Sequence, residues 1–259
     1  MITKKPKFSI VIPVYNGEST IVNAIKSCLE QSLPPDEIIV IDDASTDHTG
    51  LLIDQFASAG ILYKRNDKNS GPSFCRNLGM QIAKSEWILF LDADDIFHNK
   101  KIEVISHFIM NNDAIKAIGH AFNLQTDPPY VLNNSWQETI PITKLTIYQL
   151  LVSNRMVTPS LAVAAANKIL FNEEMKFAED HDFIIRTAEK TDIWYLDAAL
   201  CSLGRIPLSP GGISANKWKM RKGEINMYLD YCRRNRVMIA APVFVIFSLL
   251  KHLKAVFTN

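Results

Sequence analysis

The sequence predicts an α/β fold whose N-terminal half is doubly wound, with strands layered between helices. Three observations lead to this prediction. Short apolar runs alternate with segments of helical periodicity over the first ninety residues. The turns that follow these runs are acidic or contain glycine. One run, Trp87–Leu91, is apolar without a break, as expected for a strand that is buried on both faces.

The elements of this half follow from local patterns. A strand at 8–12 is expected to end at Pro13, which cannot donate to a sheet ladder. Ser19 is suited to cap the next helix, whose apolar positions recur at helical spacing until Pro34. The remaining elements are strands at 37–41, 61–63 and 87–91, a helix after Asp47 and a helix that begins at Pro72.

Right-handed crossovers place the loops after parallel strands along one edge of the sheet. Ligands of open α/β sheets collect at this edge. Tyr15, Asp43, Arg76 and Asp94 all lie in or just after such loops. The sequence therefore predicts that these four residues surround one crevice, although they are far apart along the chain.

The pattern is looser beyond Asp95. The expected elements are a helix at 100–109, a strand at 115–122, an irregular segment at 126–141, a helix at 146–153, a strand at 161–166, a helix at 183–190 and strands at 193–196 and 199–203. The glycine-containing segment Ser209–Ser214 is expected to form a flexible loop that closes over a ligand.

Composition limits the class of protein. The chain has 259 residues, of which 47% are hydrophobic and 21% charged, which suits a soluble globular protein with a sizeable core. A formal net charge of +1 gives no overall reason to expect nucleic-acid binding. The apolar run before Pro13 is too short for the core of a signal peptide, so no export signal is expected.

The cysteines are widely spaced and form no Cys-x-x-Cys pair, which argues against a zinc site or a disulfide framework. Their distribution instead indicates a reducing compartment. They are Cys28, Cys75, Cys201 and Cys232.

Three carboxylates follow the strand at 87–91 within four residues: Asp92, Asp94 and Asp95. Two carboxylates spaced Asp-x-Asp can hold a hard divalent cation and share it with phosphate oxygens. The alternative is a solvated acidic turn, which is the commoner meaning of an isolated Asp-x-Asp.

The C-terminal segment differs in character from the rest. Residues 217–236 contain seven basic side chains and two acidic ones, and Val237–Leu250 contains no charge. Fourteen uncharged residues are too few to span a bilayer, which takes about 20. A basic segment followed by an apolar one suits contact with an anionic membrane surface. The alternative is a helix that packs on the protein or in an oligomer contact.

Five segments resemble the motifs of the family 2 glycosyltransferases. They are Phe8–Asn16, Ile38–Asp47, Asn69–Asn77, Leu89–Asp95 and the pair Glu179-Asp180. The resemblance covers roughly residues 6 to 205 and implies a GT-A fold, with a Rossmann-like nucleotide-binding half, a mixed central sheet and helices on both faces. The expected organisation is a glycosyltransferase domain at 1–215 and a helical tail at 216–259.

The resemblance also implies roles for individual residues. Asp180 would be the catalytic base, and Asp94 would bind Mn²⁺ or Mg²⁺. The residues that would bind the nucleotide-sugar are Pro13, Tyr15, Glu18, Asp43 (to the base), Arg76, Asp92 (to the ribose or diphosphate) and Ala93. Two departures stand out: Cys75 replaces the usual alanine, and only Arg205 and the 209–214 loop can replace the usual basic segment near the phosphates.

These roles make a consistent reaction. A metal at Asp94 can offset the charge on a departing nucleoside diphosphate. Sugar hydroxyls ionise weakly, so a carboxylate such as Asp180 must accept the proton as the bond forms. The expected enzyme is a metal-dependent, inverting glycosyltransferase with a UDP-sugar donor. Its expected acceptor is a saccharide, for example a lipid-linked intermediate of bacterial surface polysaccharide, at the cytoplasmic face of the membrane.

Two alternatives remain open. A non-catalytic sugar-nucleotide-binding protein could retain the fold, although it would have no use for a base. A nucleotidyltransferase would carry a basic, glycine-rich loop near the N-terminus, whereas Tyr15–Glu18 is acidic. The histidines His107, His120 and His181 are expected to be ordinary helix or strand residues, although His181 adjoins Asp180.

Overall fold

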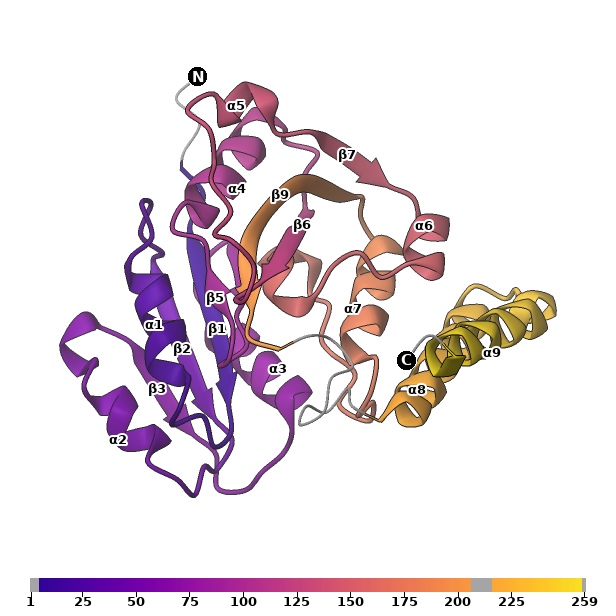
Figure 1. Ribbon diagram of the computed structural model, residues 1–259, viewed down its shortest axis with the longest axis horizontal. Coiled ribbons are helices and arrows are strands. Elements are labelled where there is room, and N and C mark those ends of the chain that lie inside the picture. The colour runs from indigo at the N-terminus through magenta and orange to yellow at the C-terminus, as the bar shows by residue number, and fades with distance from the viewer. Residues whose placement is uncertain (1–4, 206–215, 258–259) are drawn as a thin grey trace.

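A single mixed sheet with helices on both faces forms the body of the molecule, and two helices project from one side (Figure 1). The computed structural model describes residues 5–205 and 216–257. In these residues the strand order is β3-β2-β1-β4-β8-β6-β9-β5, and β7 also pairs with β9. The strands are β1 (Phe8–Val14), β2 (Glu37–Asp42), β3 (Leu62–Arg65), β4 (Trp87–Phe90), β5 (Ile96–Phe97), β6 (Ala117–Leu124), β7 (Ile142–Leu145), β8 (Leu161–Ala164) and β9 (Ile193–Leu203).

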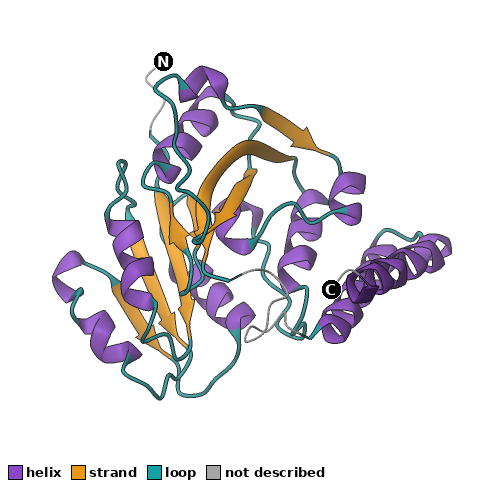
Figure 2. Cartoon of the chain, viewed as in Figure 1, coloured by secondary structure: helices purple, strands orange, loops and turns teal. Residues whose placement is uncertain are grey.

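The helices alternate with the strands in the N-terminal half and gather at the end of the chain (Figure 2). They are α1 (Ile21–Leu29), α2 (Thr49–Asp54), α3 (Pro72–Ile82), α4 (Lys101–Asn111), α5 (Trp136–Thr139), α6 (Ile147–Val152), α7 (Glu179–Ala188), α8 (Lys217–Arg234) and α9 (Ala241–Phe257).

The doubly wound half is confirmed. Strands β3, β2, β1 and β4 are parallel to one another, and β8 then pairs antiparallel to β4. Alternate residues of β4 enter different cores: Trp87 and Leu89 pack on one side, Ile88 and Phe90 on the other. The uninterrupted apolar run thus reflects a strand that is covered on both faces.

Pro13 does not end the first strand, contrary to the prediction. Strand β1 continues to Val14, and Pro13 lies opposite Ile41 of β2. On its other side, β1 pairs with β4 only as far as Val11. A proline is therefore tolerated, because no β4 neighbour requires a donor at this point.

Other boundaries also differ from the prediction. Strand β9 is one continuous strand rather than two, with irregular pairing to β6 near Ala121. Helix α7 begins at Glu179, so Glu179 and Asp180 belong to its first turn. The segment 126–141 contains the short helix α5, and the first helix is preceded by Thr20, which forms no side-chain cap. The predicted loop at 209–214 lies outside the described residues.

Helix α3 lies unusually close to β1. A Cβ atom on Gly79 would be 2.2 Å from Cγ1 of Val11, so only glycine allows this approach. The next turn of α3 is fixed by Asn77, whose side chain accepts from the backbone N–H of Phe171 at 2.7 Å and donates to its carbonyl at 3.0 Å. These contacts set the position of Arg76, which is the neighbour of Asn77.

Helices α8 and α9 form an antiparallel hairpin joined by the short turn Met238–Ala240. The carboxylate of Glu224 on α8 is buried and accepts hydrogen bonds from Ser248 and Lys251 of α9, each at 2.6 Å. The Tyr228 ring stacks on that of Phe244 at a centroid distance of 4.9 Å. In the part of the chain that the structure describes, no helix is long and apolar enough to cross a membrane.

Replacing Gly79 with alanine should lower the free energy of unfolding by about 1–3 kcal/mol, because the added methyl group overpacks the contact with Val11. This loss should exceed the gain in helix propensity, which is at most about 1 kcal/mol. Urea unfolding of Gly79→Ala, Val11→Ala and the double variant measures the effect. The double variant should lose less free energy of unfolding than the two single variants lose together. If the losses add to within about 0.5 kcal/mol, the close contact of Gly79 with Val11 is contradicted.

Candidate active site

The loops that follow β1 and β2 are bound to each other. The backbone N–H of Asn16 donates to Oγ of Ser45 at 2.9 Å, and the Asn16 side chain accepts from the N–H of Thr46 at 2.8 Å. Asn16 and Ala44 both have positive φ, at 50° and 63°. These turns form a rigid floor beside the exposed Tyr15 ring, as expected for residues at the carboxyl edge of the sheet.

Glu18 is tied to the same floor. Its Oε2 accepts from both the backbone N–H and Nδ1 of His48, each at 3.0 Å. The backbone hydrogen bond and the ring contact hold the pKa of Glu18 below its usual range. Glu18 therefore remains ionised and joins the first loop to the start of α2.

Asp43 is buried and organises the entry to α3. Its carboxylate accepts from the side chain of Asn66 at 2.8 Å and from the backbone N–H groups of Ser70 and Gly71 at 2.9 and 2.7 Å. Gly71 has φ of 91°, a conformation that favours glycine, and Pro72 then begins α3. The sequence did not signal this structural use of Asp43.

Arg76 is the centre of the site. Its Nη2 donates to Oδ1 of Asp92 at 2.7 Å, and its Nη1 donates to Oε1 of Glu179 at 3.3 Å. The guanidinium also lies over the Phe171 ring, 5.2 Å from the centroid. Burial alone would lower the pKa of Arg76, but Asp92 and Glu179 raise it, so the cation is permanent. Glu179 was predicted only as a neighbour of the base; its role as an arginine partner was missed.

Asp94 faces a second cation. Its Oδ2 lies 3.0 Å from Nε of Arg205, the basic residue that the sequence left as the candidate near the phosphates. The backbone at Gly204 passes so close that a Cβ there would be 2.1 Å from the carbonyl oxygen of Asp94. The Gly204 N–H donates to Oδ1 of Asp95 at 2.9 Å. The end of β9 therefore fixes this acidic turn.

The acidic turn is electrostatically crowded. Burial and the neighbouring Asp92 raise the pKa of Asp94 above its usual range. The same two causes raise the pKa of Asp95 to about 8. Because these pKa values are raised, an additional positive charge at the turn would stabilise the ionised carboxylates.

Asp180 lies in the first turn of α7, after Ala178, which has φ of 59°. Its Oδ1 accepts from the backbone N–H of His181 at 2.7 Å, and Asn154 reaches its Oδ2 at 3.5 Å. Burial raises the pKa of Asp180, and the nearby Asp92 adds to this effect. The contact from Asn154 had no signal in the sequence, because that region matches no motif.

None of the three predicted ordinary histidines enters the site. His181 is buried, and its Nε2 binds the carbonyl of Leu150 at 2.7 Å. His120 is buried against the carbonyl of Ala121, and the His107 ring packs edge-on against Trp136. Their structural roles agree with the prediction.

The structure therefore brings most of the predicted residues together at one edge. Contacts link Asp43 to the start of α3, Arg76 of α3 to Asp92, and Arg76 to the first turn of α7 that carries Asp180. Ala93 lies close to the first loop, 3.7 Å from where a Cβ of Gly17 would be. Pro13 lies within β1, one residue before the strand ends, and Tyr15 is 51% exposed beside the loops.

A metal ion would find one suitable carboxylate here. In residues 5–205 and 216–257 no group of three or more His, Cys, Asp or Glu side chains is arranged to hold a metal. Asp92 and Asp94 are equally exposed and each pairs with an arginine. The partner of Asp92 is the buried Arg76, whereas the partner of Asp94 is the exposed Arg205, and the pKa of Asp94 is raised. This donor set fits Mg²⁺ or Mn²⁺ bound through one carboxylate and shared with ligand phosphates, rather than a cage made only of protein.

Comparison with known proteins identifies relatives of this chain. The model of "Glycosyl transferase family 2" matches residues 9–164. An uncharacterized glycosyltransferase of Haemophilus influenzae is 37% identical over 117 residues, which are 44% of this chain and 47% of that protein. The poly(ribitol-phosphate) β-N-acetylglucosaminyltransferase TarS of Staphylococcus aureus is 28% identical over 186 residues, 70% of this chain and 32% of TarS. The chain thus spans less than half the length of these relatives.

Solved structures show the same fold. The crystal structure of TarS residues 1–349 with UDP-GlcNAc matches with a TM-score of 0.68 and 23% identity, over 86% of this chain and 66% of the other. The mannosyltransferase of Pyrobaculum calidifontis, in complex with GDP-Man and Mn²⁺, matches with a TM-score of 0.64 and 15% identity, over 99% of this chain and 76% of the other. The predicted GT-A fold is confirmed.

Replacing Arg76 with methionine should lower the free energy of unfolding by about 3 kcal/mol at pH 8, because buried carboxylates lose their counter-charge. The penalty should be smaller at pH 5. Burial and Asp180 already raise the pKa of Glu179, and losing Arg76 raises it further, so protonation at lower pH removes the unpaired charge.

Urea unfolding at both pH values measures this effect. Arg233→Met, which removes an exposed arginine paired with the exposed side chain of Asp230, is the matched control, with a loss of no more than about 1 kcal/mol and little change with pH. A pH-independent loss in Arg76→Met would show that packing over Phe171, and not charge pairing, is the main role of Arg76.

Proposed function

The chain belongs to glycosyl transferase family 2, and on this premise we propose that it is an enzyme that transfers a sugar from a UDP-sugar to a saccharide hydroxyl with inversion. The observation that supports this most is the contact of Arg76 with both Asp92 and Glu179, which joins the acidic turn after β4 to the start of α7. TarS with UDP-GlcNAc and the mannosyltransferase with GDP-Man support a nucleotide-sugar donor, and the greater similarity to TarS favours UDP.

The donor would lie across the loops after β1, β2 and β4. Tyr15 is exposed and can stack on a base, whereas Asp43 is already bonded to the 66–71 turn. Asp43 would thus shape the base pocket as well as contact the base. Asp92 holds its orientation through Arg76 and is partly exposed, so its free oxygen can accept from a ribose or sugar hydroxyl. Pro13, Glu18 and Ala93 would line the same pocket.

Asp180 would accept the proton of the attacking hydroxyl. A base is more effective when its pKa lies nearer the working pH, and burial moves the pKa of Asp180 in that direction. Glu179 is directed to Arg76, which leaves Asp180 as the carboxylate of this turn that can face an acceptor. A single base without a second flanking carboxylate nucleophile suits direct displacement with inversion.

Asp94 would hold Mg²⁺ or Mn²⁺. When bound, the ion would offset negative charge on the diphosphate. Arg205, 3.0 Å from Asp94, supplies positive charge at the same place and would move toward the phosphates when a cation binds the carboxylate. The raised pKa of Asp94 supports this role, since a crowded carboxylate gains from a cation.

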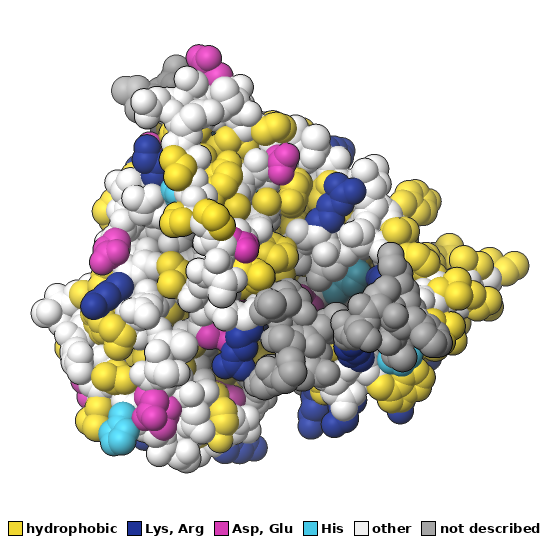
Figure 3. All heavy atoms as spheres, viewed as in Figure 1, with side chains coloured by type: hydrophobic (Ala, Val, Ile, Leu, Met, Phe, Trp, Pro, Cys, Tyr) yellow, Lys and Arg dark blue, Asp and Glu magenta, His cyan; other side chains and the backbone are white. Residues whose placement is uncertain are grey.

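The acceptor is proposed to be a lipid-linked saccharide at the cytoplasmic face of a membrane. Helix α9 exposes an apolar stripe with helical spacing, formed by Val243, Ile246, Leu250 and Leu253. Ile239 continues it and is 95% exposed. Figure 3 shows these apolar side chains (yellow) gathered over the projecting hairpin.

Basic side chains lie at both ends of this stripe. Because α8 and α9 are antiparallel, Lys219 and Lys222 of α8 lie near the end of α9, where the Trp218 ring contacts His252 at a centroid distance of 5.2 Å. Arg236 is exposed in the turn at the other end. Exposed apolar residues between cations, with an interfacial tryptophan, match an anionic membrane surface better than a packed helix. The pathway that we propose for this acceptor is the assembly of a surface polysaccharide.

A non-catalytic sugar-nucleotide-binding protein is the second candidate. It would bind UDP through the same loops but would not require Asp180. A thermal-shift panel of sugar nucleotides identifies the donor, since a ligand that binds only the folded state raises the melting temperature. Transfer by the identified donor then separates the two candidates.

Asp180→Asn should retain the fold and UDP affinity but lower the rate of transfer by about 10²- to 10⁴-fold, because an amide cannot accept the proton. Glu179→Gln should be milder and should raise the Michaelis constant for the donor, because Glu179 acts on Arg76. In the wild type, transfer should fall as the pH drops through a pKa above that of an ordinary aspartate, since the base must be ionised. Near-normal turnover by both variants would show that the catalytic base lies elsewhere.

UDP binding should depend on the divalent metal. Calorimetry should show weaker binding in EDTA than in Mn²⁺, and Asp94→Ala should remove the difference. Asp95→Asn is the control, because Asp95 binds Gly204 rather than the open side of the turn. Equal UDP affinity with Mn²⁺ and with EDTA in the wild type would rule out the metal.

The wild-type chain should bind phosphatidylglycerol vesicles at low salt and detach as salt rises, because each basic residue near the surface contributes about 1 kcal/mol. Ile246→Glu/Leu250→Glu should lose this binding with unchanged UDP affinity. Leu51→Glu, an exposed leucine of α2, is the control. Substitution is preferable to deleting 237–259, which would uncover Glu224 and Tyr228. If the wild type does not bind vesicles but dimerises through the stripe, the oligomer alternative is correct.

A further inference from the structure

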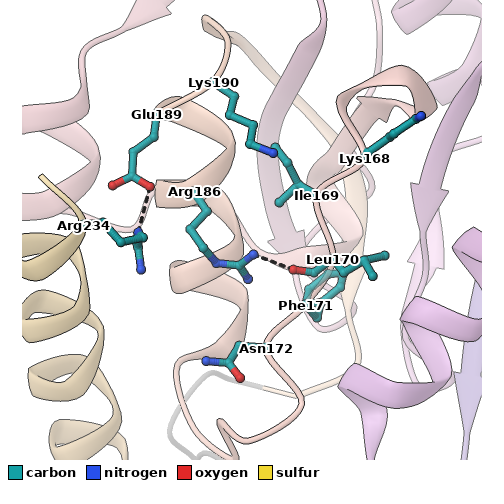
Figure 4. Close-up of a pocket in the computed structure, with 9 residues that line it drawn as sticks. All are labelled: Lys168, Ile169, Leu170, Phe171, Asn172, Arg186, Glu189, Lys190 and Arg234. Atoms are coloured by element: carbon teal, nitrogen blue, oxygen red, sulfur yellow. Dashed lines mark hydrogen bonds and ion pairs between the residues drawn. The ribbon is translucent and has the colours of Figure 1, made fainter.

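A cavity of about 570 Å³ lies on the outside of α7, and none of the predicted site residues lines it. Figure 4 shows it between α7, the end of α8 and the segment 168–172. Its volume is within the range of about 300–1,000 Å³ that is usual for small-molecule sites. This cavity, next to the helix that carries Asp180, is therefore large enough to hold a small-molecule ligand.

The lining is strongly basic. It contains Lys168, Arg186, Lys190 and Arg234 and a single acid, Glu189. Glu189 is already bonded to Arg234 at 3.1 Å. Within residues 5–205 and 216–257, neither Lys168 nor Lys190 takes part in an ion pair. Arg186 and Arg234 are paired with Asp182 and Glu189, so the unbalanced positive charge of the cavity is that of the two lysines.

Arg186 is held in a fixed orientation. Its Nε donates to Oδ2 of Asp182 at 2.7 Å, and its Nη1 donates to the carbonyl of Leu170 at 2.6 Å. Its Nη2 is covered and has no acceptor in the described part of the chain. Figure 4 shows the Lys190 amine extending from above toward the same region. The covered guanidinium is therefore part of the cavity wall, and the exposed Lys190 ammonium is the group that can donate to an oxyanion.

The remaining lining is apolar. Ile169 and Phe171 are buried, and Leu170 is partly exposed at the cavity. Bare inorganic phosphate would leave this surface and most of the volume empty. A ligand that joins an oxyanion to an organic group matches both parts of the lining.

We propose that this cavity binds a phosphate ester, with the exposed Lys190 and Lys168 binding the phosphate and Ile169 and Leu170 against its organic part. The site is distinct from the donor site. Arg186 lies six residues after Asp180 on α7, about 9 Å along the helix axis. Identification of the ester as part of the acceptor rests on the proposed function, whereas binding itself does not.

The test uses the full chain with labelled isoleucine methyl groups, because Ile169 lines this cavity. Titration with glycerol 3-phosphate should shift the Ile169 methyl signal. Lys168→Gln/Lys190→Gln should weaken binding by about tenfold or more, as expected for the loss of charge-assisted hydrogen bonds. Lys26→Gln/Lys64→Gln removes the same charge elsewhere and should leave the affinity unchanged.

A second titration with dihexanoyl phosphatidic acid separates the two sources of the ester. Binding at least about tenfold tighter than that of glycerol 3-phosphate assigns the site to a lipid phosphate; equal affinity assigns it to a soluble ester. No Ile169 shift with either probe, or equal affinity in both double variants, overturns the proposal. UDP affinity measured on the same samples tests the proposed function separately, since none of these lysines belongs to the donor site.

Discussion

The contact of Arg76 with two carboxylates is the interaction on which the site depends. Asp92 is 16 residues away in the sequence and Glu179 is 103 away, so one guanidinium joins segments that no local pattern brings together. Burying a cation is favourable only when its partners are well placed. The close approach of α3 to β1 at Gly79 and the pairing of Asn77 with Phe171 provide that placement. The same arrangement directs Glu179 to Arg76, and in the proposed function it leaves Asp180 to face the acceptor.

The sequence predicted the doubly wound half well because its signals are local. The apolar run at 87–91 and the proline at 72 are determined by burial and backbone geometry within a few residues. Pro13 was misassigned because its tolerance depends on where the neighbouring strand β4 ends, which is a tertiary fact. Asp43 was predicted as a ligand contact, but its bonds to Ser70 and Gly71 depend on a turn 27 residues away. Long-range pairing of this kind leaves no trace in residue spacing.

The helical hairpin is attached to α7, the helix that carries Asp180. Arg234, near the end of α8, lies 3.1 Å from Glu189 and 3.9 Å from Asp182, both next to or on α7. Tyr228 donates to the carbonyl of Leu151 at 2.6 Å. Within the hairpin, burial would raise the pKa of Glu224, but hydrogen bonds from Lys251 and Ser248 lower it, so it remains ionised and binds the two helices together. A surface that contacts the hairpin is therefore held at a defined orientation to the active site.

Strand β9 also limits how the chain length can vary. It pairs with β6, β7 and β5 along its eleven residues and delivers Gly204 to the turn at Asp94 and Asp95. One inserted residue would displace everything beyond it by about 3.3 Å and reverse which side chains face the core. The backbone N–H of Gly204, which donates to Asp95, would move away from that carboxylate. A side chain would then be brought against the carbonyl oxygen of Asp94. Insertions and deletions should therefore be absent between Ile193 and Gly204 in active relatives, whereas the exposed segment at 126–135 is free to change length.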